Sequence, residues 1–270
     1  MSLTRLDATL EEFEIGLTGA IPESEVWSEP AMDRGILEFV SLFCGMVFKY
    51  GGRIIHGSHP AFTPIILRQA RLQAGKRSRK PVTLVMSDLF AKDRSKEDLD
   101  SLVDIAELVI TKKIGDKDAS DPETRNRSLT AMRRVLIDSQ NVMVAVGGIS
   151  HKGDGMVPGV GEEMQLAGER GIPRFLIAGL GGYARELAKE LTPSSLKNSL
   201  SDDSNMELFR TDDVAASVNL VFNQLAESEA LARSASQPIK WNPQLRMIVD
   251  HRDGTIHNEA NQYIEQQMAL

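Results

Sequence analysis

The sequence of 270 residues is poor in cysteine, since Cys44 is the only one and no disulfide can form within the chain. It has no apolar run of the roughly 18 residues that a membrane span needs, and its N-terminus, MSLTRLDATLEEFE, has no hydrophobic signal core. Basic residues are also in deficit: 31 Lys and Arg against 38 Asp and Glu give a formal charge of -7. These shortages predict a cytoplasmic protein that binds neither membranes nor nucleic acid in bulk.

Several common functional motifs are missing as well. No Gly-x-Gly-x-x-Gly follows the first expected strand, and there is neither a Walker phosphate loop nor a nucleophile elbow. The five histidines are scattered and show no metal-ligand spacing. We therefore expect no metal and no resident cofactor. Cys44 lies within the apolar run 36–48, where a buried structural thiol is expected rather than a nucleophile.

What the sequence does contain is a regular alternation of short apolar runs and helical patterns. Strands are expected at 14–21, 53–57, 81–87, 107–111, 141–147 and 173–178, and helices at 33–49, 64–73, 95–106, 123–139, 162–170 and 183–191. This alternation predicts an α/β protein, a Rossmann-like three-layer α/β/α domain with a mostly parallel sheet, over residues 1–195. Residues 196–270 are expected to form a linker with a short strand at 207–209, a C-terminal helix, and a tail that packs on the domain or on a partner subunit.

Glycines gather in the loops that follow the expected strands. In parallel sheets ligands bind outside the carboxyl ends of the strands, and these loops lie there. Glycine lets the backbone approach a ligand closely and exposes N–H groups to it. We therefore expect ligand contacts from Gly19, Gly57, Gly147, Gly148, Gly155, Gly159, Gly161 and Gly181, together with Ser58, His59, Asp88 and Asp154 from the same loops.

Charged residues near two helix starts are further candidates. Glu162 and Glu163 fall in the first turn of the helix expected at 162–170, where they either complement the helix dipole or face the ligand as sugar-binding or catalytic carboxylates. The helix N-terminus is expected to lower the pKa of Glu163. Arg125 and Arg127 begin the helix at 123–139 and suit either anion binding or structural ion pairs, whereas Arg133, two turns on, is expected to be structural.

Four segments together resemble the SLOG superfamily, the Rossmann-like nucleotide-binding group that includes the Lonely Guy phosphoribohydrolases and the DNA-processing protein A domain. They are LTGAIPE (17–23), GGRIIHGSHPAFTPII (51–66), SLTAMR (128–133) and VAVGGISHKGDGMVPGVGEE (144–163). The likeness spans about residues 13–191 and is strongest to prokaryotic branches associated with conflict or anti-phage systems. It implies a pocket for a nucleotide or a nucleotide-derived signal.

The resemblance also implies a role for one carboxylate. Residues 159–163 are similar to the Gly-Thr-x-Glu-Glu portion of the Lonely Guy signature, which gives Glu163 the catalytic glutamate position, although Val160 replaces the phosphate-contacting Thr. Three functions are therefore open. They are a nucleotide sensor acting with a separate effector protein, an N-glycosidase or base-exchange enzyme using Glu163, and a protein-interaction scaffold. A homo-oligomer is expected, with the apolar tail buried in the assembly.

Overall fold

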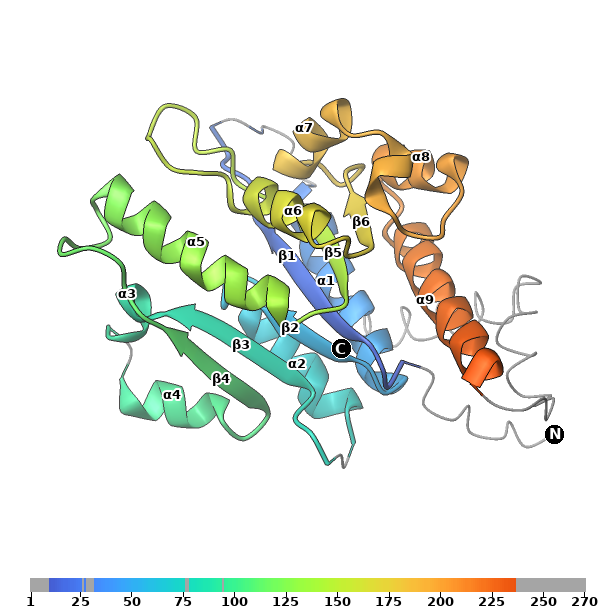
Figure 1. The fold of residues 1–270 in the computed structure, drawn as a ribbon, viewed down its shortest axis with the longest axis horizontal. Coiled ribbons are helices and arrows are strands. Elements are labelled where there is room, and N and C mark those ends of the chain that lie inside the picture. The colour runs from blue at the N-terminus through green and yellow to red at the C-terminus, as the bar shows by residue number, and fades with distance from the viewer. Residues whose placement is uncertain (1–9, 26, 28–31, 76–77, 94, 237–270) are drawn as a thin grey trace.

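A single sheet of parallel strands runs through the centre of the computed structural model, which describes residues 10–25, 27, 32–75, 78–93 and 95–236 (Figure 1). Its strand order is β4-β3-β2-β1-β5-β6, and every neighbouring pair is parallel. The strands are β1 (Glu14–Ala20), β2 (Arg53–His56), β3 (Val82–Ser87), β4 (Ala106–Thr111), β5 (Val142–Gly147) and β6 (Arg174–Ile177). The Rossmann-like arrangement expected from the sequence is confirmed.

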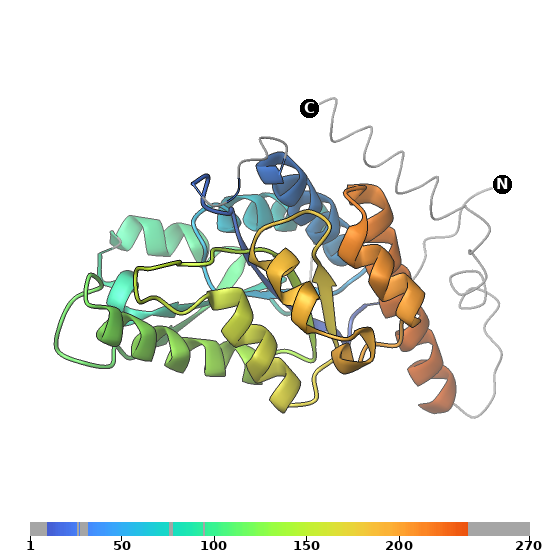
Figure 2. The ribbon, with the colours of Figure 1, turned by 90° about the horizontal axis from the view of Figure 1, so that it is seen from above.

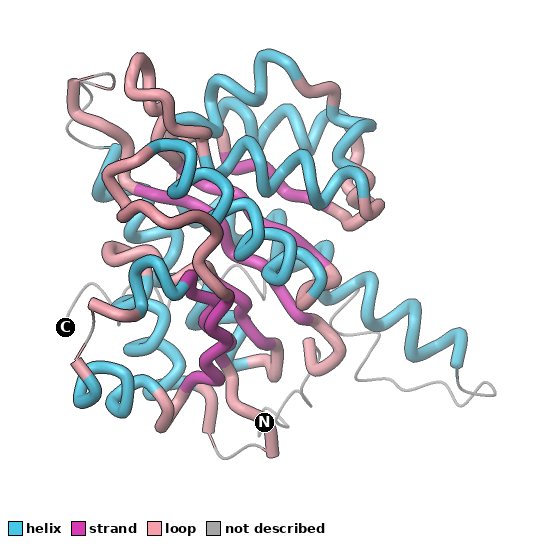
Figure 3. The backbone as a smooth tube through the Cα atoms, turned by 60° about the vertical axis from the view of Figure 1, so that its left-hand side comes forward, coloured by secondary structure: helices cyan, strands magenta, loops and turns pink. Residues whose placement is uncertain are grey.

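Helices cover both faces of this sheet (Figure 2). One face carries α1 (Met32–Lys49) and α2 (Thr63–Gln73), and the other carries α5 (Pro122–Asp138) and α6 (Gly159–Glu169). The remaining connections hold α3 (Asp88–Ala91), α4 (Lys96–Leu102), α7 (Tyr183–Glu190) and a 3-10 helix at Pro193–Leu196. Figure 3 shows the strands running between helices on both sides. No helix in the described part of the chain has the length and apolarity to cross a membrane.

Burial explains why these segments form the elements they do. All residues of β3 and β5 are buried, as continuous apolar strands must be when helices cover both sides of a sheet. Polar residues mark helix starts: the Asp121 carboxylate caps α5 by accepting from the Thr124 N–H at 2.9 Å, and the Ser95 hydroxyl caps α4. Cys44 lies fully buried in the core beneath the sheet, and this burial raises the pKa of its thiol.

The C-terminal region differs from the prediction. The strand expected at 207–209 is wrong, because these residues lie in α8 (Asp202–Arg210), which the Ser201 hydroxyl caps by accepting from the Ser204 N–H at 3.1 Å. The carbonyl of Leu208 accepts from the backbone N–H groups of residues 178 and 179, so α8 is joined to the end of β6. The last helix, α9 (Val214–Ser236), packs on α1. The expected tail beyond it lies outside the described residues.

Candidate functional site

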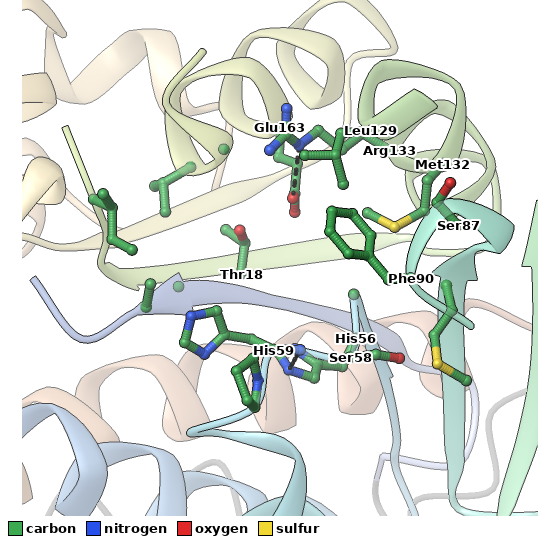
Figure 4. A pocket seen from close by; sticks show the side chains of 18 of the residues that line it. Thr18, His56, Ser58, His59, Ser87, Phe90, Leu129, Met132, Arg133 and Glu163 are labelled. Atoms are coloured by element: carbon green, nitrogen blue, oxygen red, sulfur yellow. Dashed lines mark hydrogen bonds and ion pairs between the residues drawn. The ribbon is translucent and has the colours of Figure 1, made fainter. Parts of the chain in front are cut away.

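A cavity of about 500 Å³ opens at the carboxyl edge of the sheet (Figure 4), within the size range of small-molecule sites. It lies at the switch point of the topology, because the chain leaves β1 towards one face of the sheet and leaves β5 towards the other. The lining residues are Leu17, Thr18, Gly19, Ala20, His56, Gly57, Ser58, His59, Pro60, Met86, Ser87, Phe90, Arg125, Leu129, Met132, Arg133, Ile149, His151, Gly159, Val160 and Glu163.

Glu163 presents a buried carboxylate to this cavity. Its side chain is only 9% exposed, and its Oε1 lies 3.5 Å from Nε of Arg133, which is buried to a similar degree (Figure 4). Burial raises the pKa of Glu163, while Arg133 and the Thr18 hydroxyl on β1 oppose that rise. The predicted lowering of this pKa by the helix N-terminus is wrong. The reason is that α6 begins at Gly159, so Glu163 lies beyond its first turn and its burial dominates.

Glu162 has a different environment from its neighbour. Its two carboxylate oxygens accept from the Arg133 guanidinium and from the Thr130 hydroxyl, both on α5, and it does not line the cavity. Arg133 therefore contacts both glutamates, and it lines the cavity as well. The structural role expected for Arg133 is only part of what this residue does. Its side chain joins α5 to α6, and it also holds the Glu163 carboxylate, which faces the cavity.

Two histidines, His56 at the end of β2 and His59 just after it, are kept neutral by their buried surroundings. Nδ1 of His56 lies 2.8 Å from the carbonyl oxygen of Leu17, and its Nε2 accepts from the backbone N–H of His59 at 3.1 Å. Full burial lowers the pKa of His56 to about 4, so it is a neutral structural residue. Burial also lowers the pKa of His59, whose Nδ1 accepts from the Ala61 N–H, which leaves its Nε2 as the donor nitrogen.

Ser58 adopts a left-handed backbone at the rim of the cavity, with φ of 60°. This conformation is unfavourable for a residue with a Cβ and is found most often at functional sites. Gly57 precedes it, and both line the cavity. The turn after β2 therefore presents backbone to the cavity.

Glu23, in the loop after β1, holds the long loop after β5 over the cavity. One carboxylate oxygen of Glu23 accepts from the backbone N–H of His151 at 2.8 Å and from the Ser150 hydroxyl at 3.2 Å. His151 also lines the cavity, and its Nδ1 lies 3.2 Å from a carboxylate oxygen of Asp154. These bonds fix the loop although Asp154 itself is exposed.

The predicted site residues divide into two groups. The cavity brings together Glu163, Gly19, Gly57, Ser58, His59, Arg125 and Gly159. Outside its lining lie Glu162, Asp88, Arg127, Asp154, Gly147, Gly148, Gly155, Gly161 and Gly181. Arg127 is an exposed partner of Glu123, and Asp88 is the exposed first residue of α3.

Most glycines in the second group serve contacts within the chain. Gly147 and Gly182 bring two loops together so closely that a Cβ on Gly182 would lie 2.6 Å from the carbonyl carbon of Gly147. A Cβ on Gly161 would lie 2.8 Å from the ring of Tyr183. The clustering of glycine after β5 therefore reflects loop packing beside the cavity as much as ligand access.

Sequence reasoning missed Thr18 and Phe90. Thr18 is an internal residue of β1, and nothing in the pattern of that strand distinguishes it from other inward-facing positions. Phe90 lies in α3, a helix of four residues that is too short for periodicity to reveal. The described residues contain no cluster of three or more His, Cys, Asp or Glu side chains able to hold a metal ion.

These features define a Rossmann-like α/β protein with a ligand-sized cavity at its topological switch point. The family model described as SLOG cluster2 matches residues 40–229, which is more than half of the chain. The protein belongs to this SLOG family. Among solved structures, the chain is similar to the X-ray structure of TM1055, a structural-genomics target, with 13% identity and a TM-score of 0.44 over 72% of this chain and 88% of that one. No curated protein matches the sequence.

Proposed function

We propose that the cavity binds a nucleotide or nucleotide-derived ligand and that Glu163 holds its sugar. The observation that carries this proposal is a buried carboxylate turned into a ligand-sized cavity and kept there by Arg133 and Thr18. A carboxylate accepts hydrogen bonds from two neighbouring hydroxyls, which is how acidic residues in related folds hold ribose. Membership of the SLOG family supports a nucleotide-related ligand.

The start of α6 is the expected contact for a phosphate. No side chain caps this helix, because Pro158 occupies the N-cap position and offers no side-chain acceptor. The first N–H groups of an uncapped helix attract anions, and Gly159 and Val160 of that turn line the cavity. Gly57 and Ser58 offer backbone on the opposite side, at the end of β2.

In the cell, we propose that the protein is a cytoplasmic sensor of a nucleotide-derived signal in conflict or anti-phage signalling. The resemblance of residues 51–66 and 144–163 to conflict-associated SLOG branches supports this role. A separate effector protein would carry the response, and homo-oligomer formation would couple neighbouring cavities.

Calorimetric titration with AMP, ADP-ribose, NAD and cyclic nucleotides tests the binding proposal, with chromatography of each mixture to detect products. We expect at least one of these compounds to bind and to be recovered intact. If none of them binds, the proposal fails and the scaffold function is favoured.

An N-glycosidase is the second candidate, favoured by the environment of Glu163. A carboxylate with a raised pKa in a cavity is characteristic of catalytic acids. The ionised form would stabilise the positive charge that develops on the sugar as the base departs with the bonding electrons. Water would then add to the sugar carbon and lose a proton, and the departed base would take up one proton, so that free base and free sugar are the products. Release of free base in the chromatographic assay would establish this function in place of the sensor.

A further inference from the structure

Phe90 is the one phenylalanine that the hydrophobic core does not use. The chain has nine phenylalanines, and the other eight belong to or pack against the two core clusters. Phe90 instead lines the cavity, half-buried, and Figure 4 shows its ring extending into the cavity from α3. A large apolar ring kept out of the core and turned towards a ligand space needs a partner that such a ring binds well.

Arg125 lies over this ring. Its guanidinium carbon is 5.5 Å from the centroid of Phe90, which is within cation–π distance, and Arg125 also lines the cavity. Among the residues that the structure describes, no carboxylate pairs with Arg125, whereas Arg127 two positions on pairs with Glu123. Its contact with the Phe90 ring is therefore the interaction that places its side chain.

The surroundings of this pair are apolar. Leu129 and Met132 lie beside the Phe90 ring (Figure 4), and Met86 lines the same cavity; methionine side chains adapt readily to flat aromatic surfaces. The nearby Ser87 hydroxyl accepts from the Leu89 N–H and caps α3. This end of the cavity thus offers stacking surface, whereas hydrogen-bonding side chains gather around Glu163 and Thr18.

We propose that Phe90 and Arg125 form a stacking platform for the aromatic base of the ligand, so that the base lies at the α3 end of the cavity and its sugar faces Glu163. This inference rests on the proposed function, and it adds the orientation of the ligand. Aromatic rings and guanidinium planes are the side-chain groups on which nucleobases stack, and such stacking works for any base because every base has a π face.

The test compares a ligand with a base and one without: AMP and ribose 5-phosphate, titrated calorimetrically into wild type and Phe90→Leu. We expect Phe90→Leu to weaken AMP binding about tenfold, the loss typical of one stacked base. Ribose 5-phosphate binding should not change. The separate variant Phe90→Tyr should bind AMP about as well as wild type, because tyrosine keeps the aromatic ring. Phe13→Leu is the matched control, since Phe13 packs against the core outside the cavity lining and its loss should lower thermal stability alone.

Two results would overturn the platform while leaving the proposed function intact. One is unchanged AMP affinity in Phe90→Leu, and the other is an equal loss for AMP and ribose 5-phosphate, which would make Phe90 a wall of the cavity without a role in base recognition. If wild type does not bind AMP, the comparison is made with ADP-ribose, NAD or a cyclic nucleotide in its place, and failure of wild type to bind any of them would count against the proposed function and, with it, the platform.

Discussion

The two edges of the sheet each bury an arginine among carboxylates, but they complete its hydrogen bonds differently. At the amino edge, Arg53 is 6% exposed and every guanidinium nitrogen is used: Nη1 contacts both oxygens of Glu14, Nη2 donates to Thr83 and Nε donates to the Lys80 carbonyl. At the carboxyl edge, Arg133 is equally buried, but its Nε makes no hydrogen bond within the chain and only a longer ion pair, 3.5 Å from Oε1 of Glu163.

Of these two arginines, Arg133 lines the cavity and Arg53 does not. Leaving a buried polar group without a hydrogen bond is costly, and beside a cavity a ligand can supply the missing partner. At the amino edge the chain itself completes the network around Arg53. At the carboxyl edge Arg133 and Glu163 face a cavity, where a bound ligand would reorganise and complete their contacts.

Breaking the amino-edge network gives the largest expected effect on stability. Arg53→Met leaves the Glu14 carboxylate without its buried partner, and the free energy of unfolding should fall by about 3–5 kcal/mol in urea titration. Ligand affinity of the folded fraction should not change. Arg79→Met is the control, because Arg79 pairs with the same Glu14 but is 67% exposed, and a loss below about 1 kcal/mol is expected. Similar losses in the two variants would contradict the comparison.

His56 sharpens the comparison because it lies at the cavity edge yet is fully hydrogen-bonded. Its pKa falls from 6.5 to about 4, so the unfolded state takes up a proton first as the pH drops. This group should therefore remove about 3 kcal/mol of stability between pH 6.5 and pH 4, and nothing further below that range. His56→Asn should be less stable at pH 7 but should show a flatter acid limb in unfolding curves measured across these pH values. An unchanged acid limb would place the pH dependence elsewhere.

Glu163 should show the opposite pH dependence and a smaller effect. Its pKa is raised above the usual 4.5, so the folded state favours the protonated form and the destabilising charge appears as the pH rises above that value. Glu163→Gln should therefore be close to wild type in stability near pH 4 and more stable than wild type at neutral pH. Glu162→Gln, which breaks the ion pair with Arg133, should lose stability at neutral pH. Thermal melts at both pH values distinguish the two variants.

The sequence predicted the sheet well because its strands carry strong local signals. The continuous apolar runs of β3 and β5 permit few other structures. The prediction of a strand at 207–209 is wrong, because it rested on three residues, Glu207–Phe209, and did not take account of the helix cap at Ser201. The Ser201 cap, six residues before Glu207, and the helical pattern that follows it outweigh that short pattern.

The site was predicted less completely, since its chemistry depends on burial. Glu163 was identified by its resemblance to a known motif, but the start of α6 was placed three residues late because Gly159 and Gly161 read as loop. That error led to the wrong direction of the pKa shift. The joint contact of Arg133 with Glu162 and Glu163 comes from the packing of α5 on α6, which no local pattern encodes.

The most direct test of the account is the affinity of Glu163→Gln beside that of Glu162→Gln for the tightest-binding nucleotide, measured by calorimetry at neutral pH. Glutamine keeps the shape of the side chain and removes its charge. We expect Glu163→Gln to weaken binding by about 1–3 kcal/mol, the cost of losing charge-assisted hydrogen bonds to the sugar, and Glu162→Gln, outside the cavity lining, to weaken it less. Wild-type affinity in Glu163→Gln, or a larger loss in Glu162→Gln, would contradict the assignment of Glu163 as the ligand-holding carboxylate.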